Sequence, residues 1–408
     1  MKQLALIFAL AAVVLGTSAC VNLNGSGNNP YKALDLSTKS AELARQGNTF
    51  AFQFIDRVSD ATADDYIISP LSMQFLLGMI LNGAQGDTAD EICKVLGYGA
   101  GEVDDVNTYC LAMLQQLPGL DKKTKLSIAN AIFVNQQYQL RNEYKQAVGR
   151  FYEAEATNLD FSKNTAATNH INDWCSKNTN GLVPKVLDNV SPNMLAYLLN
   201  AMYFKSEWKQ KFSKSNTEQE PFTNESGAKK KVPMMKTEKG FGYQENDVLR
   251  AVRLPYGNGA FSMTVILPAE GKKLSDVTDY LSGESWDAFV RTMVGCEVDL
   301  WLPKFETKFH IKLNDILSAM GMPLSFSAKA DFSPMSPAAL CLSFVQQDAV
   351  IKVDEEGTEA AVVSSAGMEA TAAAPGQHVV FHADRPFLYL ITETSTGAVL
   401  FAGRYSGK

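Results

Sequence analysis

Four histidines, His170, His310, His378 and His382, are the residues with which this chain could most readily carry out acid–base or metal chemistry. None of them belongs to an HExxH zinc motif, and the sequence contains no GxSxG nucleophile elbow. It also contains no Walker loop and no dinucleotide-binding glycine pattern. We therefore predict no catalytic residue, no metal site and no cofactor, and we expect a protein that is not an enzyme.

The cysteine spacing and the net charge argue against further classes of protein. Apart from Cys20, the five remaining cysteines are widely spaced and form no CxxC pair, so we expect small buried thiols at Cys93, Cys110, Cys175, Cys296 and Cys341. The net charge of −7 argues against a general affinity for nucleic acid. The 408 residues show no internal repeat and no linker in the middle, so we expect one domain over residues 40–408 and a monomer.

The N-terminus has the pattern of an export signal. The stretch "MKQLALIFALAAVVLGTSAC" begins with the basic Lys2 and continues with apolar residues from Leu4 to Leu15. This apolar stretch is too short to cross a bilayer and is typical of a cleaved secretory signal. The chain is therefore expected to be secreted across the inner membrane.

Residues 16–20 resemble the end of a bacterial lipoprotein signal, with Thr17 in place of the usual Leu. We predict a signal peptide over residues 1–19, a lipid on Cys20 and a flexible Gly-, Ser- and Asn-rich tether over residues 20–39. The anchor is expected in the outer membrane, on its periplasmic or its cell-surface face. The alternative is an ordinary secretory signal, cut near this cysteine and carrying no lipid.

A long stretch of small residues lies about thirty residues before the C-terminus. Fourteen of the twenty residues from Gly357 to Gly376 are Gly, Ala, Ser or Thr, and no Phe, Trp or Tyr occurs between Phe344 and Phe381. A structureless segment of this length is uncommon in a compact domain and is usually functional or disordered. Because strand-like sequences flank it on both sides, we predict an exposed loop over residues 355–378 that is anchored at both ends.

The elements that hold this loop follow from local patterns. Residues 50–58 place Phe, Phe and Val four apart, as in an amphipathic helix, and Ser69 followed by Pro70 is a typical helix start. Residues 88–91 match a capping box. Helical patterns dominate early and strand-length apolar runs dominate late, so we predict an α+β fold. These runs include residues 126–134, 197–204 and 261–268.

The loop itself also has the pattern of a strand. Counted in steps of two from Thr358 to Ala370, every residue is uncharged, while the intervening set contains Glu359 and Glu369. One apolar and one charged face is the pattern of a half-buried strand. Small side chains could enter between existing strands without overpacking a core. The segment can therefore exist as a loop or as a strand.

The sequence "VDEEGTEAAVV" resembles the hinge of the serpins. The stretches "YIISPLSMQFLLGMILNGAQGDTADEI", "LSIANAIFV", "LLNAMYFKSEWKQKF", "LPYGNGAFSMTVILP" and "ADRPFLYLI" resemble further serpin motifs in family order. The resemblance covers roughly residues 40–408. It implies the serpin fold, in which helices pack around large, mainly antiparallel sheets and a reactive-centre loop is exposed.

The resemblance implies irreversible inhibition of a protease by loop insertion. A target protease attacks the loop and forms an acyl-enzyme, and the cut loop then enters the central sheet and distorts the captured active site. Small, uncharged residues at Thr358 and Ala360 favour inhibition, whereas the bulkier Val362 and Val363 would slow the first steps of insertion. The alternative is a non-inhibitory binding lipoprotein on the same fold. The residues that match the hinge are Glu355, Glu356, Gly357, Thr358, Ala360 and Ala361.

Family spacing implies a reactive bond between Thr371 and Ala372, with Ala370 or Ala372 as alternative scissile residues. The small side chains of "MEATAAA" suit an elastase-like serine protease, and a papain-like cysteine protease is the alternative target. No Lys or Arg occurs between Lys352 and Arg385, which argues against a trypsin-like target.

The resemblance also implies residues that support the opening sheet. Ser69, Ser72 and Asn200 match a polar cluster beneath it, and Trp208 matches an aromatic residue near the insertion point. Gln347 stands where the family usually has a histidine, so a network can form without the pH dependence of that histidine.

Overall fold

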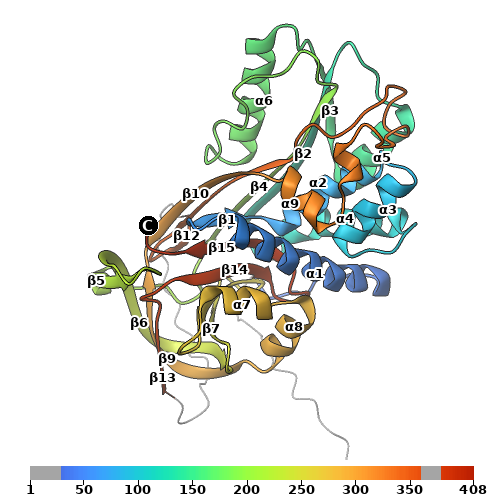
Figure 1. The fold of residues 1–408 in the computed structure, drawn as a ribbon. Helices are drawn as coiled ribbons and strands as arrows, with labels where there is room; N and C mark the ends of the chain where they lie inside the picture. Colours follow the sequence, from blue (N-terminus) through green and yellow to red (C-terminus); the bar gives the residue numbers. More distant parts are fainter. Residues whose placement is uncertain (1–28, 360–377) are drawn as a thin grey trace, which may run out of the picture.

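The computed structural model describes residues 29–359 and 378–408. In these parts two large β-sheets lie against each other, and most of the helices gather on one side of them (Figure 1). The predicted α+β class is confirmed.

The helices follow the predicted patterns in most places. Ser69 caps α2, because its Oγ accepts a hydrogen bond from the Ser72 amide at 3.2 Å. The capping box expected at residues 88–91 is wrong, because Thr88 and Glu91 instead accept hydrogen bonds from distant backbone amides. The helices are α1 (Thr38–Ala61), α2 (Pro70–Leu81), α3 (Asp87–Leu96), α4 (Val103–Gln116), α5 (Asn142–Tyr152), α6 (Asn164–Asn178), α7 (Leu274–Tyr280), α8 (Gly283–Arg291) and α9 (Asn314–Met320).

The smaller sheet has the strand order β10-β11-β12-β4-β2-β3. All neighbours are antiparallel except β2 and β3. Strand β12 is only two residues long, yet it occupies the middle of this sheet. The strands are β2 (Lys125–Asn135), β3 (Glu155–Leu159), β4 (Ala196–Glu207), β10 (Phe305–Lys312), β11 (Gln346–Val353) and β12 (Gly357–Thr358).

The larger sheet has the order β1-β15-β14-β8-β7-β6-β9-β13, with β5 paired to β6. Its strand β13 resumes the chain after the predicted loop and pairs with β9 in parallel. The strands are β1 (Tyr66–Ile68), β5 (Glu218–Thr223), β6 (Lys229–Glu245), β7 (Leu249–Pro255), β8 (Phe261–Pro268), β9 (Val294–Pro303), β13 (His378–His382), β14 (Phe387–Glu393) and β15 (Val399–Tyr405).

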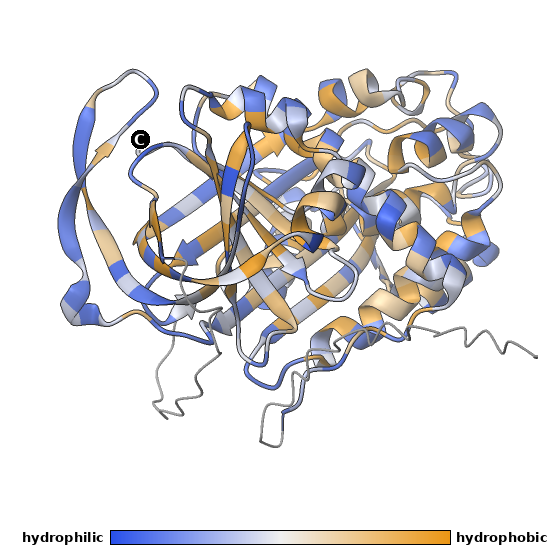
Figure 2. Ribbon diagram, turned by 90° about the horizontal axis from the view of Figure 1, so that it is seen from below, coloured by the Kyte–Doolittle hydropathy of each residue, from blue (hydrophilic) through white to orange (hydrophobic). Residues whose placement is uncertain are grey.

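The core lies between the two sheets and under the helices. All twelve residues of α2 are buried, and this helix contacts both β4 and β15. Helix α6 covers the opposite face of the smaller sheet through a separate apolar cluster that includes Phe133, Ile171 and Tyr197. Hydrophobic residues concentrate on the inner strands and hydrophilic ones on the outward helix faces (Figure 2).

Three peripheral features complete the comparison with the sequence. The predicted tether was to reach residue 39, but residues 30–35 hydrogen-bond to the body and α1 begins at Thr38. The thiols of Cys93, Cys110, Cys175 and Cys296 are buried as expected, whereas that of Cys341 is exposed. Within the described residues, none of the helices combines the length and the apolar character that a membrane span requires.

Candidate functional site

The hinge enters the smaller sheet at one end. Strand β12 pairs with β11 through Thr358 and Val353, and with β4 through Thr358 and Ser206. Strands β4 and β11 form no direct pairing with each other over their described lengths. The first residues of the predicted loop are therefore already seated as a short central strand.

The seat of Thr358 faces the core. This side chain is 2% exposed, and its Oγ1 shares a hydrogen bond of 2.5 Å with the hydroxyl of Tyr256. The Tyr256 ring stacks on Trp208 with a centroid distance of 4.6 Å. At Gly357 an added Cβ would lie 2.1 Å from the Ser206 carbonyl oxygen, so only glycine fits there. The seat admits a small, uncharged side chain and a glycine before it.

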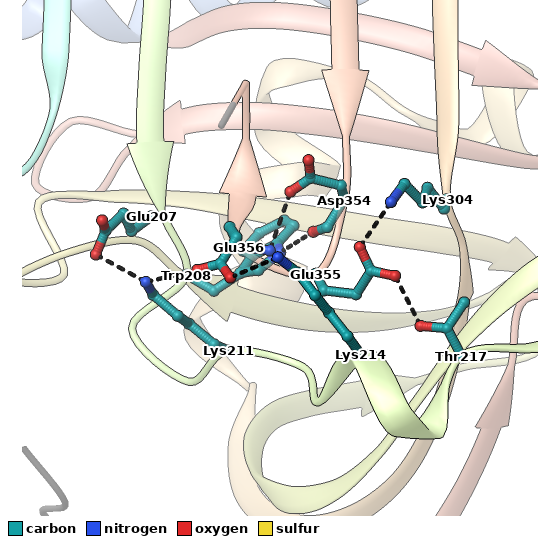
Figure 3. Close-up of polar contacts among 9 residues, drawn as sticks. All are labelled: Glu207, Trp208, Lys211, Lys214, Thr217, Lys304, Asp354, Glu355 and Glu356. Atoms are coloured by element: carbon teal, nitrogen blue, oxygen red, sulfur yellow. Dashed lines mark hydrogen bonds and ion pairs between the residues drawn. The ribbon is translucent and has the colours of Figure 1, made fainter. Parts of the chain in front are cut away.

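Trp208 fixes the backbone that leads into this seat. Its indole Nε1 donates to the Asp354 carbonyl at 2.8 Å, and its amide donates to the Glu356 carbonyl at 2.9 Å (Figure 3). The Phe212 amide donates to the Glu355 carbonyl at 3.1 Å. The turn between β11 and β12 is therefore held by the segment that follows β4.

Two ion-pair groups hold the hinge carboxylates (Figure 3). Glu355 is 4% exposed; it pairs with Lys304 Nζ at 2.9 Å and accepts from Thr217 Oγ1 at 2.8 Å. Burial acts to raise the pKa of Glu355, but the hydrogen bonds from Lys304 and Thr217 outweigh it and leave this pKa below its ordinary value. Glu356 pairs with Lys211 at 2.8 Å and Lys214 at 3.3 Å.

We expect Lys304→Ala to lower the free energy of unfolding by roughly 1–3 kcal/mol at pH 7, because it leaves a buried carboxylate oxygen without its donor. A lowered folded-state pKa means that the pair stabilises the fold above the unfolded pKa of Glu and loses this effect as pH falls through the folded value. The difference from wild type should therefore shrink below about pH 4. Chemical denaturation of the wild type and the variant, at pH 7 and below about pH 4, measures this difference in the free energy of unfolding.

Lys308→Ala is the matched control for this prediction. Lys308 lies on β10, the strand that begins directly after Lys304, and pairs with Glu306 at 3.1 Å; the Lys308 side chain is largely exposed and that of Glu306 about half exposed. Its loss should change the free energy of unfolding by less than about 1 kcal/mol. Equal effects of the two substitutions would contradict a special role for the buried pair.

The space between β4 and β11 beyond Thr358, which we call the slot, continues as cavities. One of about 70 Å³ lies at the middle of the slot, and one of about 280 Å³ lies at its far end and is lined mainly by apolar residues. The segment that follows α6 lines the middle cavity through Leu182, Val183 and Val186. Among residues 29–359 and 378–408, β12 is the only strand between β4 and β11, and the slot beyond Thr358 is long enough for a further strand.

The predicted polar cluster lies at the middle of the slot. Gln347 accepts from the Ser69 amide at 2.8 Å and donates to the Ser69 carbonyl at 3.0 Å. Ser72 Oγ donates to Asn200 Oδ1, and Asn200 Nδ2 donates to Asn130 Oδ1 at 2.7 Å. Gln347 thus makes two hydrogen bonds at the position expected for a histidine.

Several predicted site residues lie outside the described residues: Cys20, Ala360, Ala361, Val362, Val363, Ala370, Thr371 and Ala372. The structure brings the others together at the mouth and the middle of the slot. It adds Lys211, Lys304, Thr217, Tyr256 and Asn130, which sequence reasoning missed. No local pattern could have found these residues, because their partners are distant in the chain.

A two-residue strand at the mouth of a slot in which the described residues place no further strand defines a class of protein whose sheet can accept one more strand. The family model described as Serpin (serine protease inhibitor) matches residues 45–407. The chain belongs to the serpin family. Serpins are generally protease inhibitors rather than catalytic enzymes.

Individual relatives agree with this assignment. The chain is 36% identical to an uncharacterised serpin-like protein of Thermococcus kodakarensis, over 88% of this chain and 84% of that protein. It is 32% identical to serpin B6 of Macaca fascicularis, over 89% of this chain and 99% of that protein. The crystal structure of tengpin, a thermophilic serpin in the native state, has a TM-score of 0.82 at 29% identity, over 93% and 97%. The structure of thyroxine-binding globulin in complex with thyroxine has a TM-score of 0.80 at 27% identity, and the match covers 90% of this chain and 99% of that one.

Proposed function

We propose that this protein irreversibly inhibits a serine protease of elastase-like preference. The protease attacks the loop and forms an acyl-enzyme, and the cut loop then enters the slot and carries the protease with it. The observation that supports this most directly is the seat of Thr358 between β4 and β11. Insertion has a starting point there, and beyond it none of the described residues forms a strand between β4 and β11.

Elastase-like preference rests on the loop sequence. The proposed reactive bond, Thr371–Ala372, is flanked by Ala370 and Ala373, and small side chains fit the shallow pocket of an elastase. A papain-like cysteine protease could attack the same bond through its thiolate. The lipid on Cys20 and an outer-membrane location are part of the same proposal. Incorporation of labelled fatty acid, and its loss in Cys20→Ser, tests the lipid.

We expect a covalent complex when the purified protein is mixed with pancreatic elastase. A denaturing gel should show a band near the summed masses of the two proteins, because the acyl-enzyme ester survives denaturation. Elastase with its active-site serine chemically blocked is the control and should give no band. Mass spectrometry of the released peptide should show a new N-terminus at Ala372. Clean cleavage without a complex would contradict inhibition of elastase, and papain is then tested in the same way.

The similarity to thyroxine-binding globulin, solved with thyroxine bound, favours a second candidate function. On this alternative the chain is a non-inhibitory binding lipoprotein on the serpin fold. It predicts that no serine or cysteine protease forms a stable complex, even when each of them cuts the loop.

A further inference from the structure

Glu359 is the residue at which the described chain leaves the smaller sheet. Its amide donates to the Lys352 carbonyl at 2.8 Å, which extends the β11–β12 pairing by one hydrogen bond. Its φ is +49°, a left-handed conformation that is unfavourable for a residue with a Cβ. The backbone therefore turns away from the extended path one residue after Thr358, at a conformational cost.

The Glu359 side chain is held on the outer face of the sheet. Its Oε1 accepts from the Tyr203 hydroxyl at 3.1 Å, and this hydroxyl accepts from Asn180 Nδ2 at 3.3 Å. Asn180 lies just after α6, so these three residues, which we call the latch, connect the exit point to the segment covering the slot. The second oxygen, Oε2, is buried and finds no partner among the described residues. Among the described residues, the latch therefore gives a hydrogen-bond donor to only one of the two carboxylate oxygens of Glu359.

The register of β12 defines a second place for this carboxylate. Thr358 pairs with Ser206 and Val353, so an extended Glu359 would pair with Lys205 on β4 and Lys352 on β11. Residues paired across strands point to the same face, and these two lysines alternate with the inward-facing, buried Ser206 and Val353. Neither lysine forms an ion pair within the described parts of the chain. An extended Glu359 would lie between two unpaired cations.

We propose that Glu359 is a two-position switch: Tyr203 and Asn180 hold it while the loop is exposed, and Lys205 and Lys352 receive it on insertion. The exchange would also return the Glu359 backbone from its left-handed to an extended conformation, and it would bring the unpaired Oε2 close to a positive charge. Tyr203 is then a positioning residue that stops insertion after Thr358 until the loop is cut. The proposal rests on loop insertion as part of the proposed function.

Tyr203→Phe is the first test, because it removes one hydroxyl and keeps the ring. Thr358 remains held by Tyr256 and by both neighbouring strands, so loss of the latch should favour insertion rather than release of the hinge. After cutting of the loop, the heat-stable form should appear roughly three- to tenfold faster than in wild type. The uncut variant should also become resistant to loop cleavage faster on warming.

The double variant Lys205→Gln, Lys352→Gln tests the second position. It should slow the appearance of the heat-stable form roughly two- to fivefold, because the inserted carboxylate loses both charged neighbours. Tyr197→Phe is the matched control on β4; its hydroxyl accepts from the Ser191 amide at 3.0 Å, and its rate should equal that of wild type. The switch is wrong if Tyr203→Phe inserts no faster than this control, or if the lysine variant inserts as fast as wild type.

The rate of insertion is measured without any trapped protease, so the outcome separates this proposal from the proposed function. Rates that change as expected in a protein that traps no protease would leave the switch standing and overturn inhibition. Normal trapping with unchanged rates would leave inhibition standing and overturn the switch. A cut loop that never inserts would overturn both.

Discussion

Thr358→Arg is expected to convert this protein from an inhibitor of its target protease into a plain substrate. Thr358 is 2% exposed and points at Tyr256 in the core, so a guanidinium at this position would have to be buried without a counter-charge. Burial of an unpaired charge costs several kcal/mol, and about 1.4 kcal/mol already changes an equilibrium or rate ratio tenfold. The covalent band with elastase should therefore fall at least about tenfold, while cleavage of the loop continues.

Thr358→Ser is the matched control, because it keeps the hydroxyl that meets Tyr256 and should keep trapping. Melting of the uncut Thr358→Arg protein shows whether the variant still folds, since the hinge can leave its seat to place the arginine in solvent. Undiminished trapping by a folded Thr358→Arg protein would show that the seat of Thr358 is not the start of insertion.

Cutting the loop is expected to raise the melting temperature by on the order of 20 °C. About a dozen residues entering the slot, at about 1 kcal/mol net per backbone hydrogen bond, give on the order of 10 kcal/mol. For a protein of this size each kcal/mol raises the melting temperature by roughly 2 °C. The uncut protein is thus expected to be a kinetically trapped, metastable state. Calorimetry before and after limited cleavage by elastase measures the change.

The Thr358→Arg variant provides the control for this measurement. It is cut at the same bond but cannot begin to insert at its seat, so its melting temperature should rise much less. A cut wild-type protein that melts at or below the temperature of the uncut protein would mean that the slot is not filled by the loop.

The sequence was sufficient for the family and for the residues of the hinge. Motifs in family order over most of the chain and the alternation that begins at Thr358 are local patterns, and such patterns can be read along one chain. The same kind of reading failed at residues 88–91, where Thr88 and Glu91 accept hydrogen bonds from residues more than two hundred positions away instead of capping α3. Cys341 was expected to be buried and is exposed, because residue type alone does not fix burial at a given position.

The sequence by itself determined that a strand-like loop is tethered at both ends, because periodicity and composition are properties of neighbouring residues. Only the tertiary structure decided that Thr358 is already seated between two strands and that the backbone turns off the extended path at Glu359. It also paired Glu355 with Lys304 and Thr217, and Gln347 with Ser69, whose positions in the chain differ by 51 to 278 residues. Contacts over such separations arise from the packing of whole elements, and no local pattern records which elements will meet.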